Sequence, residues 1–332
     1  MDNLVKITEA FGFNKKYISA ERITSGHIND TYKILYSDNE KYILQRVNNK
    51  IFKNPEKIMH NIRLLNKAFC GADKIKVPCY IESDGKNYII FNGSLWRMCP
   101  FINQTVSFNK FDNARLCQGF GSILGSFHKL TLGINTFVFH ETISGFHNTA
   151  EIIERLFDYG KPVMHSGILK CAAQYSKTLM SAQKQQIVHN DAKCSNILFY
   201  KNSLEPAAII DLDTVMPGLT AYDIGDAVRS SCTDGSEINT DKFIEFLKGY
   251  ISGYGSINAQ RCIYGTICIT AELASRYIYD FLSGENYFKF QSGRMKLERF
   301  RELVLLAEHI EIRADELINI AETLNRQLGE NI

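Results

Sequence analysis

The 332-residue sequence predicts an α+β chain of two unlike lobes, a small antiparallel β-rich N-lobe and a larger, mostly α-helical C-lobe. Three observations support this fold class. Apolar and polar residues alternate between turn signals over the first hundred residues, as in an antiparallel meander. From about residue 111, apolar residues recur at helical spacing instead. Between the two patterns the segment 96–102 forms a connector, which divides the chain into residues 1–102 and 103–332.

The alternation predicts the elements of the N-lobe. Strands are expected near 20–24 and over 31–37 and 41–47, separated by short polar turns. Residues 54–69 predict one helix, because Pro55 follows a candidate Asn54 cap and the next apolar residues recur every three to four positions. Two more strands are expected at 77–82 and 87–91.

Helical periodicity dominates the rest of the chain. Apolar residues from Leu116 to Leu130 predict a long amphipathic helix. A hairpin is expected around 187–213, followed by helices over 241–251, 258–283 and 293–327. A cleft between two such lobes is a natural ligand site.

Composition excludes several classes of protein. The 38 basic and 36 acidic side chains leave a net charge of +2, which is too balanced for a nucleic-acid partner. Nine cysteines, an odd number with no C-x-x-C pair, indicate reduced thiols. No apolar run reaches the ~20 residues that span a bilayer, so we expect a cytoplasmic protein without a membrane partner. The oligomeric state stays open, and a monomer is compatible with the sequence.

The stretch VHNDAKCSNILFY at 188–200 carries the chemistry. Phosphoryl transfer needs a carboxylate to orient the acceptor hydroxyl, oxygen ligands for Mg²⁺ and cations to balance charge. In H-x-D-x-K-x-x-N, Asp191 suits the base, Lys193 the charge balance and Asn196 a metal ligand. The next apolar strand ends at Asp211, the main metal carboxylate, and Asp213 also faces the metal in this interpretation. The alternative is that these are turn-forming residues of a hairpin.

This motif, with I-D-x-D at 210–213, resembles the aminoglycoside phosphotransferase/choline kinase-like family, relatives of the protein kinases. A closer resemblance, to the N-acetylhexosamine 1-kinases, is carried by GHINDTY at 26–32, YILQRVNNKIFKNPEKIMHNI at 42–62, DLDTVMPGLTAYDIGDAVR at 211–229 and RYIYDFLSGENYFK at 276–289. The resemblance runs from about residue 20 to 290. It implies a bilobal protein-kinase-like fold, ATP and Mg²⁺ as cofactors, and phosphorylation of the anomeric hydroxyl of N-acetylglucosamine or N-acetylgalactosamine.

The resemblance also places the nucleotide. It puts the turn with Gly26, His27 and Asn29 over the phosphates, although an ordinary hairpin turn explains this stretch equally well. It makes the segment 96–102 the hinge that meets adenine through the backbone of Met98, Cys99 and Phe101.

The strand at 41–47 is expected to supply a cation to the phosphates. Alternation leaves open whether Gln45 or Arg46 points into the cleft, and we favour Arg46 because guanidinium suits oxyanions. Glu56 is the nearest acid to orient it, or else it stabilises a helix start. His189 is expected to hold the loop by a hydrogen bond, and Asp223 to brace the loop or cap a helix.

The acceptor assignment also rests on the resemblance. Arg276 and Tyr287 match residues that contact the sugar, with Asp191 facing its hydroxyl; a helix-surface Arg and a half-buried Tyr are the alternative. Six basic and three acidic residues between 275 and 301 do not suit a polycationic acceptor. The competing hypotheses are a kinase for another small alcohol (homoserine, choline, an aminoglycoside or another hexose) and an inactive nucleotide-binding regulatory module.

Overall fold

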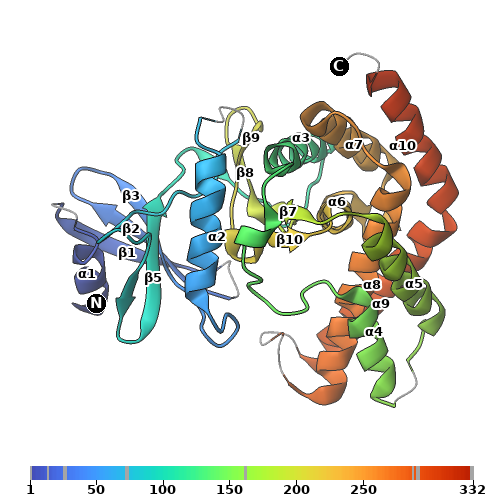
Figure 1. The fold of residues 1–332 in the computed structure, drawn as a ribbon, viewed down its shortest axis with the longest axis horizontal. Helices are drawn as coiled ribbons and strands as arrows, with labels where there is room; N and C mark the ends of the chain where they lie inside the picture. The colour runs from blue at the N-terminus through green and yellow to red at the C-terminus, as the bar shows by residue number, and fades with distance from the viewer. Residues whose placement is uncertain are drawn as a thin grey trace.

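The N-lobe is built on a five-stranded antiparallel sheet (Figure 1). The computed structural model describes residues 2–12, 15–24, 28–71, 75–160, 163–285, 288 and 292–329. The sheet order is β1-β2-β3-β5-β4. Its strands are β1 (Tyr17–Ile23), β2 (Asp30–Tyr36), β3 (Lys41–Arg46), β4 (Ile89–Phe91) and β5 (Ser94–Pro100).

The two faces of this sheet pack against different parts of the protein, because alternate residues of a strand point to opposite sides. Leu44 of β3 lies in a core cluster with Ile7 of helix α1 (Asp2–Glu9). Val47, just after β3, lies in the larger cluster that continues through the helical lobe. The face that carries Gln45 is therefore turned toward the C-lobe, and the face that carries Arg46 toward α1.

Helix α2 (Pro55–Ala68) joins the sheet to the C-lobe, and Figure 1 shows it between the two. It matches the predicted helix, although Asn54 makes no capping hydrogen bond. The buried Asn61 donates to the carbonyls of His140 at 2.7 Å and Val215 at 2.9 Å. These bonds fix α2 against two segments of the C-lobe.

The strand expected at 77–82 does not form. The chain there is extended, and the Ile81 amide donates to the Met98 carbonyl at 2.8 Å, but no ladder continues. Pro78 lacks the amide hydrogen that a ladder needs, which accounts for the difference.

The C-lobe is mostly helical, and Figure 1 shows its helices gathered on the side away from the sheet. With the N-lobe sheet, it confirms the predicted bilobal α+β fold class. Its helices are α3 (Ala114–Thr131), α4 (Thr149–Asp158), α5 (Ser166–Ala182), α6 (Thr220–Ser231), α7 (Thr240–Tyr254), α8 (Ala259–Ser283), α9 (Gly293–Ile312) and α10 (Ala314–Gly329). The single helix expected over 293–327 is thus two helices that meet at Arg313. Among the described helices, none has both the length and the apolar character that crossing a bilayer requires.

Short strands carry the polar loops of the C-lobe. β7 (Gln186–Val188) pairs with β10 (Met216–Gly218), and β8 (Ile197–Tyr200) pairs with β9 (Pro206–Ile209) and β6 (Thr105–Val106). Strands β11 (Thr233–Asp234) and β12 (Glu237–Ile238) form a separate hairpin. Three 3₁₀ turns complete the lobe: η1 (Thr136–Val138), η2 (Cys194–Asn196) and η3 (Leu212–Thr214).

Helices α6 and α8 cross in very close contact. A Cβ on Gly225 would lie 2.5 Å from the backbone carbonyl of Gly265, and a Cβ on Gly265 would lie 2.0 Å from the Ala221 carbonyl oxygen. Only glycine permits such a crossing. The crossing matters for the site because α6 carries Asp223 and Asp226.

Candidate active site

The loop between β7 and η2 is held by its own histidine. His189 Nε2 donates to the Ile210 carbonyl at 2.9 Å, and the Asp191 amide donates to His189 Nδ1 at 3.3 Å. One ring nitrogen thus carries the proton and the other accepts. This imidazole ties the loop to the chain that leads to Asp211, the role expected from the sequence.

The loop places three polar side chains together. Lys193 Nζ donates to Asp191 Oδ2 at 2.6 Å, and Asn196 Nδ2 donates to the same oxygen at 3.0 Å. Asn196 Nδ2 also bonds the Asp191 carbonyl at 2.8 Å, which fixes the amide orientation. Burial opposes the charge on Lys193, but the carboxylates of Asp191 and Asp211 outweigh it and raise the Lys193 pKa above its ordinary value.

The β8–β9 hairpin brings Asp211 to this group. Ile197 pairs with Ile209, and the Ile210 amide donates to the Asn196 carbonyl at 2.9 Å. Asp211 then turns out of the hairpin with φ +63°, a left-handed conformation that a non-glycine residue rarely adopts.

Asp211 has no cationic partner in the part of the chain that the structure describes. Among the described residues it makes no side-chain hydrogen bond or ion pair. Burial, together with the neighbouring carboxylates of Asp213 and Asp191, raises its pKa to about 6. Asp191 and Asp213 pair with Lys193 and Arg97, whereas the third carboxylate, Asp211, is left for a bound cation. The Asp211 carboxylate and the amide oxygen of Asn196 are ligands that Mg²⁺ prefers.

Asp213 has a different environment from the one predicted. It is almost fully buried, with Oδ1 2.5 Å from Arg97 Nη1, while Oδ2 accepts from Asn29 Nδ2 at 2.7 Å. Asn29 also accepts the Asn48 amide at 3.0 Å. Both oxygens of Asp213 are therefore used to connect the N-lobe to the C-lobe, and the metal site proposed below omits it.

The preference for Arg46 over Gln45 is corrected by the structure. Arg46 is half exposed on the α1 side of the sheet and forms its ion pair with Asp30, its cross-strand neighbour, rather than with Glu56. Gln45 points to the C-lobe side and accepts from Arg97 Nε at 3.0 Å. The cation on that face is thus Arg97 of β5, which is fully buried and stacked 4.8 Å over the Tyr80 ring.

The predicted hinge residues lie at the end of β5. Met98 is buried on the α1 side of the sheet, and its carbonyl is occupied by the Ile81 amide. Cys99 is buried on the opposite face, and the Phe101 amide donates to the Lys41 carbonyl at 2.9 Å. The Met98 carbonyl and the Phe101 amide are therefore already bonded within the N-lobe.

Asp223 of α6 braces the loop that precedes Asp191. Its carboxylate accepts the amides of His189 at 2.7 Å and Asn190 at 2.6 Å, and His128 of α3 approaches at 3.0 Å. Burial would raise the Asp223 pKa, but these donors outweigh it and hold the pKa below its ordinary value. The loop before Asp191 is thus positioned by a buried, ionised carboxylate.

A second buried acid links the loop to helix α8. Glu272 Oε1 accepts from His147 Nδ1 at 3.0 Å and from Arg276 at 2.7 Å, while Oε2 accepts from Thr149 at 2.7 Å. The other nitrogen of His147 donates to the Asn190 carbonyl at 2.8 Å. Both ring nitrogens face acceptors, which favours the doubly protonated ring, and Glu272 raises the pKa of His147 above its ordinary value despite burial.

Arg276, predicted to contact the acceptor, is therefore connected to the residue before Asp191. Its guanidinium also lies 5.0 Å from the ring of Phe146. Gly26, His27 and Tyr287 lie outside the described residues, and their predicted roles stay predictions.

Sequence reasoning missed Arg97, His147 and Glu272. Arg97 and Glu272 each interrupt an apolar run, and a buried charge requires a partner. That signal was available for both residues. The partner of each comes from a distant segment, which no spacing rule identifies, and His147 lies in a loop without any pattern.

Comparison with known proteins identifies the family and proteins of similar fold. A profile described as "Phosphotransferase enzyme family" matches residues 19–264. A choline/ethanolamine kinase family protein from Mesorhizobium loti superposes with a TM-score of 0.67 at 13% identity, over 97% of this chain and 100% of that one. Spectinomycin phosphotransferase with ADP and spectinomycin gives 0.62 at 17% identity, over 93% and 98%. Amicoumacin kinase hAmiN in complex with AMP-PNP, Ca²⁺ and Ami gives a TM-score of 0.61 at 15% identity, over 92% of this chain and 93% of that one.

The family profile covers most of the chain, so the protein belongs to the phosphotransferase enzyme family. At 13–17% identity, the three structures show that it shares the fold of these kinases.

Proposed function

We propose that this protein is an ATP- and Mg²⁺-dependent kinase that phosphorylates the anomeric C1 hydroxyl of an N-acetylhexosamine, N-acetylglucosamine or N-acetylgalactosamine. The observation that carries the phosphotransfer is the meeting of Asp191, Asn196 and Asp211 at the ends of β7, η2 and β9. Nucleotides in two of the similar structures, ADP and AMP-PNP, support ATP as the donor.

Each residue has one role in this proposal. Asp191 orients the acceptor hydroxyl and takes its proton, and Lys193 offsets negative charge on the transferring phosphoryl group. Asn196 and Asp211 hold the metal ion, which when bound neutralises charge on the phosphate oxygens. Asp223 and His147 hold the loop in place through hydrogen bonds to its backbone.

The acceptor assignment is supported by the sequence resemblance and by the position of Arg276. The excess of basic over acidic residues at 275–301 is largely neutralised, because four of the six basic residues have acidic partners. It therefore gives less support for a neutral acceptor than the residue counts alone. These pairs are Arg276–Glu272, Arg294–Glu298, Lys296–Asp280 and Arg299–Glu302. A neutral acceptor remains compatible with this balance. Nine unpaired thiols also fit a reducing cytoplasm as the location.

A panel of acceptors tests the proposal. N-acetylglucosamine, N-acetylgalactosamine, glucose, homoserine, choline and kanamycin are compared by ADP release, with ³¹P NMR to locate the new phosphate. We expect kcat/KM for an N-acetylhexosamine to exceed the others by at least about tenfold, since unmatched polar groups in a site are costly. Preference for another alcohol refutes the acceptor, and Mg²⁺–nucleotide binding without any turnover favours an inactive module.

A further inference from the structure

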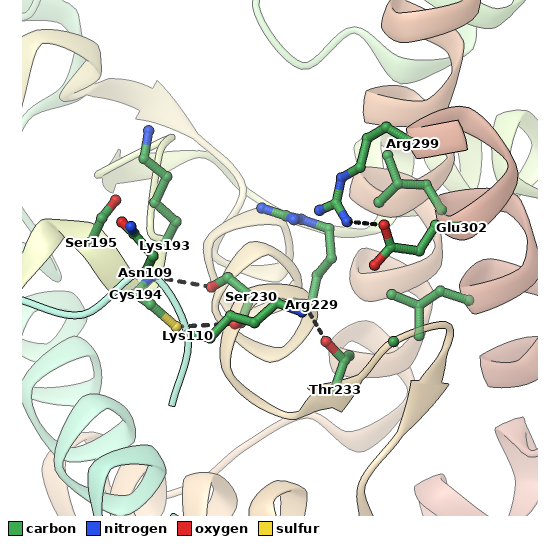
Figure 2. A pocket seen from close by; sticks show the side chains of 13 residues that line it. Asn109, Lys110, Lys193, Cys194, Ser195, Arg229, Ser230, Thr233, Arg299 and Glu302 are labelled. Atoms are coloured by element: carbon green, nitrogen blue, oxygen red, sulfur yellow. Dashed lines mark hydrogen bonds and ion pairs between the residues drawn. The ribbon is translucent and has the colours of Figure 1, made fainter. Parts of the chain in front are cut away.

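A cavity beside the catalytic loop has no role in the proposed reaction. Its volume is about 170 Å³, and Figure 2 shows the side chains that line it. Four segments contribute: the loop before α3, the catalytic loop, the end of α6 with the hairpin after it, and α9. We call it the basic cavity, and its charged lining residues are Lys110, Lys193, Arg229, Arg299 and Glu302.

The lining of the basic cavity is mostly cationic, although three of its four cations have carboxylate partners. Arg299 pairs with the lining Glu302 at 2.6 Å, and Lys193 pairs with Asp191 at 2.6 Å. Arg229 pairs with Asp226, but its Nε at 2.9 Å and Nη2 at 2.6 Å both bond the same oxygen. Its Nη1 is left without a hydrogen-bond partner among the described residues. Lys110 forms no salt bridge with any of them.

Burial makes this charge significant. The Arg229 side chain is only 9% exposed, so its field is poorly screened by water. In Figure 2 the guanidinium groups of Arg229 and Arg299 turn toward the same space. Each guanidinium has one carboxylate partner, Asp226 for Arg229 and Glu302 for Arg299, and the N–H donors that these pairs leave free are suited to an anion.

We propose that the basic cavity binds a small oxyanion of the phosphate class, as free inorganic phosphate or as the phosphoryl group of a sugar phosphate. Guanidinium groups match the oxygens of such an ion, and Ser195, Ser230 and Thr233 add hydroxyl groups to the lining. A volume of about 170 Å³ equals roughly six water molecules, which accommodates one phosphate-sized group.

Lys193 connects the basic cavity to the reaction. Its side chain lines the cavity, while its Nζ bonds Asp191 at 2.6 Å. A bound anion competes with Asp191 for this ammonium group, so occupancy lowers kcat without raising the acceptor KM. This step rests on the proposed role of Lys193, whereas binding of the anion does not.

Calorimetric titration of the full-length protein with inorganic phosphate, without nucleotide or metal, tests the binding. We expect saturable binding of one phosphate, weakened about tenfold by Arg299→Gln and by Lys110→Gln, since each removes a charged donor. Arg294→Gln is the matched control, because Arg294 lies on the same helix, is 88% exposed and is not among the lining residues. Absence of saturable binding, or equal weakening by the control, overturns the proposal.

N-acetylglucosamine 1-phosphate in the same titration identifies the source of the anion. Tighter binding than inorganic phosphate assigns the cavity to a sugar phosphate, and weaker binding assigns it to the free ion.

Kinetics then test the connection to catalysis. Inorganic phosphate should inhibit the wild type at saturating MgATP and acceptor, and Arg299→Gln should remove this inhibition with basal turnover unchanged. Equal inhibition of both proteins would place the phosphate at the nucleotide site and overturn the connection. The calorimetry requires no turnover, so it is decided independently of the proposed function.

Discussion

Replacing Glu272 by Gln removes the charge that holds His147 and Arg276 near the catalytic loop. The carboxylate is 1% exposed. Burial alone would raise its pKa, but His147 and Arg276 outweigh burial and lower the pKa from 4.5 to about 2. We expect Glu272→Gln to destabilise the protein strongly at neutral pH, because two cations lose their partner in a buried site.

The pKa shift sets the magnitude. A lowering of about 2.5 units at 1.36 kcal/mol per unit corresponds to about 3 kcal/mol at pH 7. For a chain of this length that is a loss of about 5 °C in Tm. A carboxylate whose pKa is lowered by folding stabilises the folded protein at any pH above its unfolded pKa. The effect of Glu272→Gln on stability should therefore shrink as pH falls from 4.5 toward 2.

His147 gives the opposite trend on the alkaline side. Burial lowers its pKa, but Glu272 outweighs burial and raises it above 6.5. Its contribution is therefore complete below pH 6.5 and is lost as pH rises through the raised value. The difference in stability between wild type and Glu272→Gln should be largest between pH 4.5 and 6.5, and should decrease below this range and above the raised pKa of His147.

Urea unfolding from about pH 3 to 9 measures this difference. The matched control is Glu298→Gln, which breaks the exposed Arg294–Glu298 pair and should cost no more than about 0.5 kcal/mol. A loss below about 1 kcal/mol for Glu272→Gln, or a loss that does not vary with pH, would refute the argument.

Three further predictions address other parts of the structure. Asp211→Asn should raise the Tm of the metal-free protein at pH 7, because it removes a carboxylate whose pKa is raised to about 6. The same substitution should abolish the further rise in Tm that Mg²⁺ with AMP-PNP causes in the wild type. Unchanged metal-dependent stabilisation would contradict the metal site. Gly225→Ala should lower the free energy of unfolding in urea by about 1–3 kcal/mol, because the added Cβ would clash with the backbone of α8. Gly167→Ala on α5 is the control, since a Cβ there has nothing within 4 Å and should be neutral or stabilising. Equal effects of the two substitutions would refute the close crossing. Cys194 is buried with a pKa raised to about 12, so a thiol reagent at pH 8 should label the exposed Cys70, Cys79 and Cys171 first, and early modification of Cys194 counts against this burial.

The sequence predicts the fold well where periodicity is strong. Helix α2, helix α3 and the strands β1 to β3 lie within a few residues of their expected positions. The strand expected at 77–82 is absent because Pro78 lacks an amide hydrogen. The break between α9 and α10 at Arg313 was not expected, because the apolar pattern continues through it. Periodicity reports which face of an element is apolar, and it does not report where backbone bonds end.

The candidate site is predictable where its residues are close in sequence. Asp191, Lys193 and Asn196 share one loop, and the hairpin that follows carries Asp211 to them. The orientation of Gln45 and Arg46 was not predictable, because it depends on which face of the sheet α1 covers.

Long-range partners were also beyond the sequence. The ion pair of Arg97 with Asp213 and the bridge from Arg276 through Glu272 and His147 join segments more than a hundred residues apart. Burial creates the requirement for such partners, but only the tertiary fold determines which residues meet.

The central claim is that Asp191 is the base of a phosphotransfer site. The most direct test is kcat of Asp191→Asn with the best acceptor at saturating MgATP, measured together with the Kd for the Mg²⁺–nucleotide complex. We expect kcat to fall by about 10²–10⁴ while the nucleotide Kd changes less than about threefold. A kcat close to that of the wild type would contradict it.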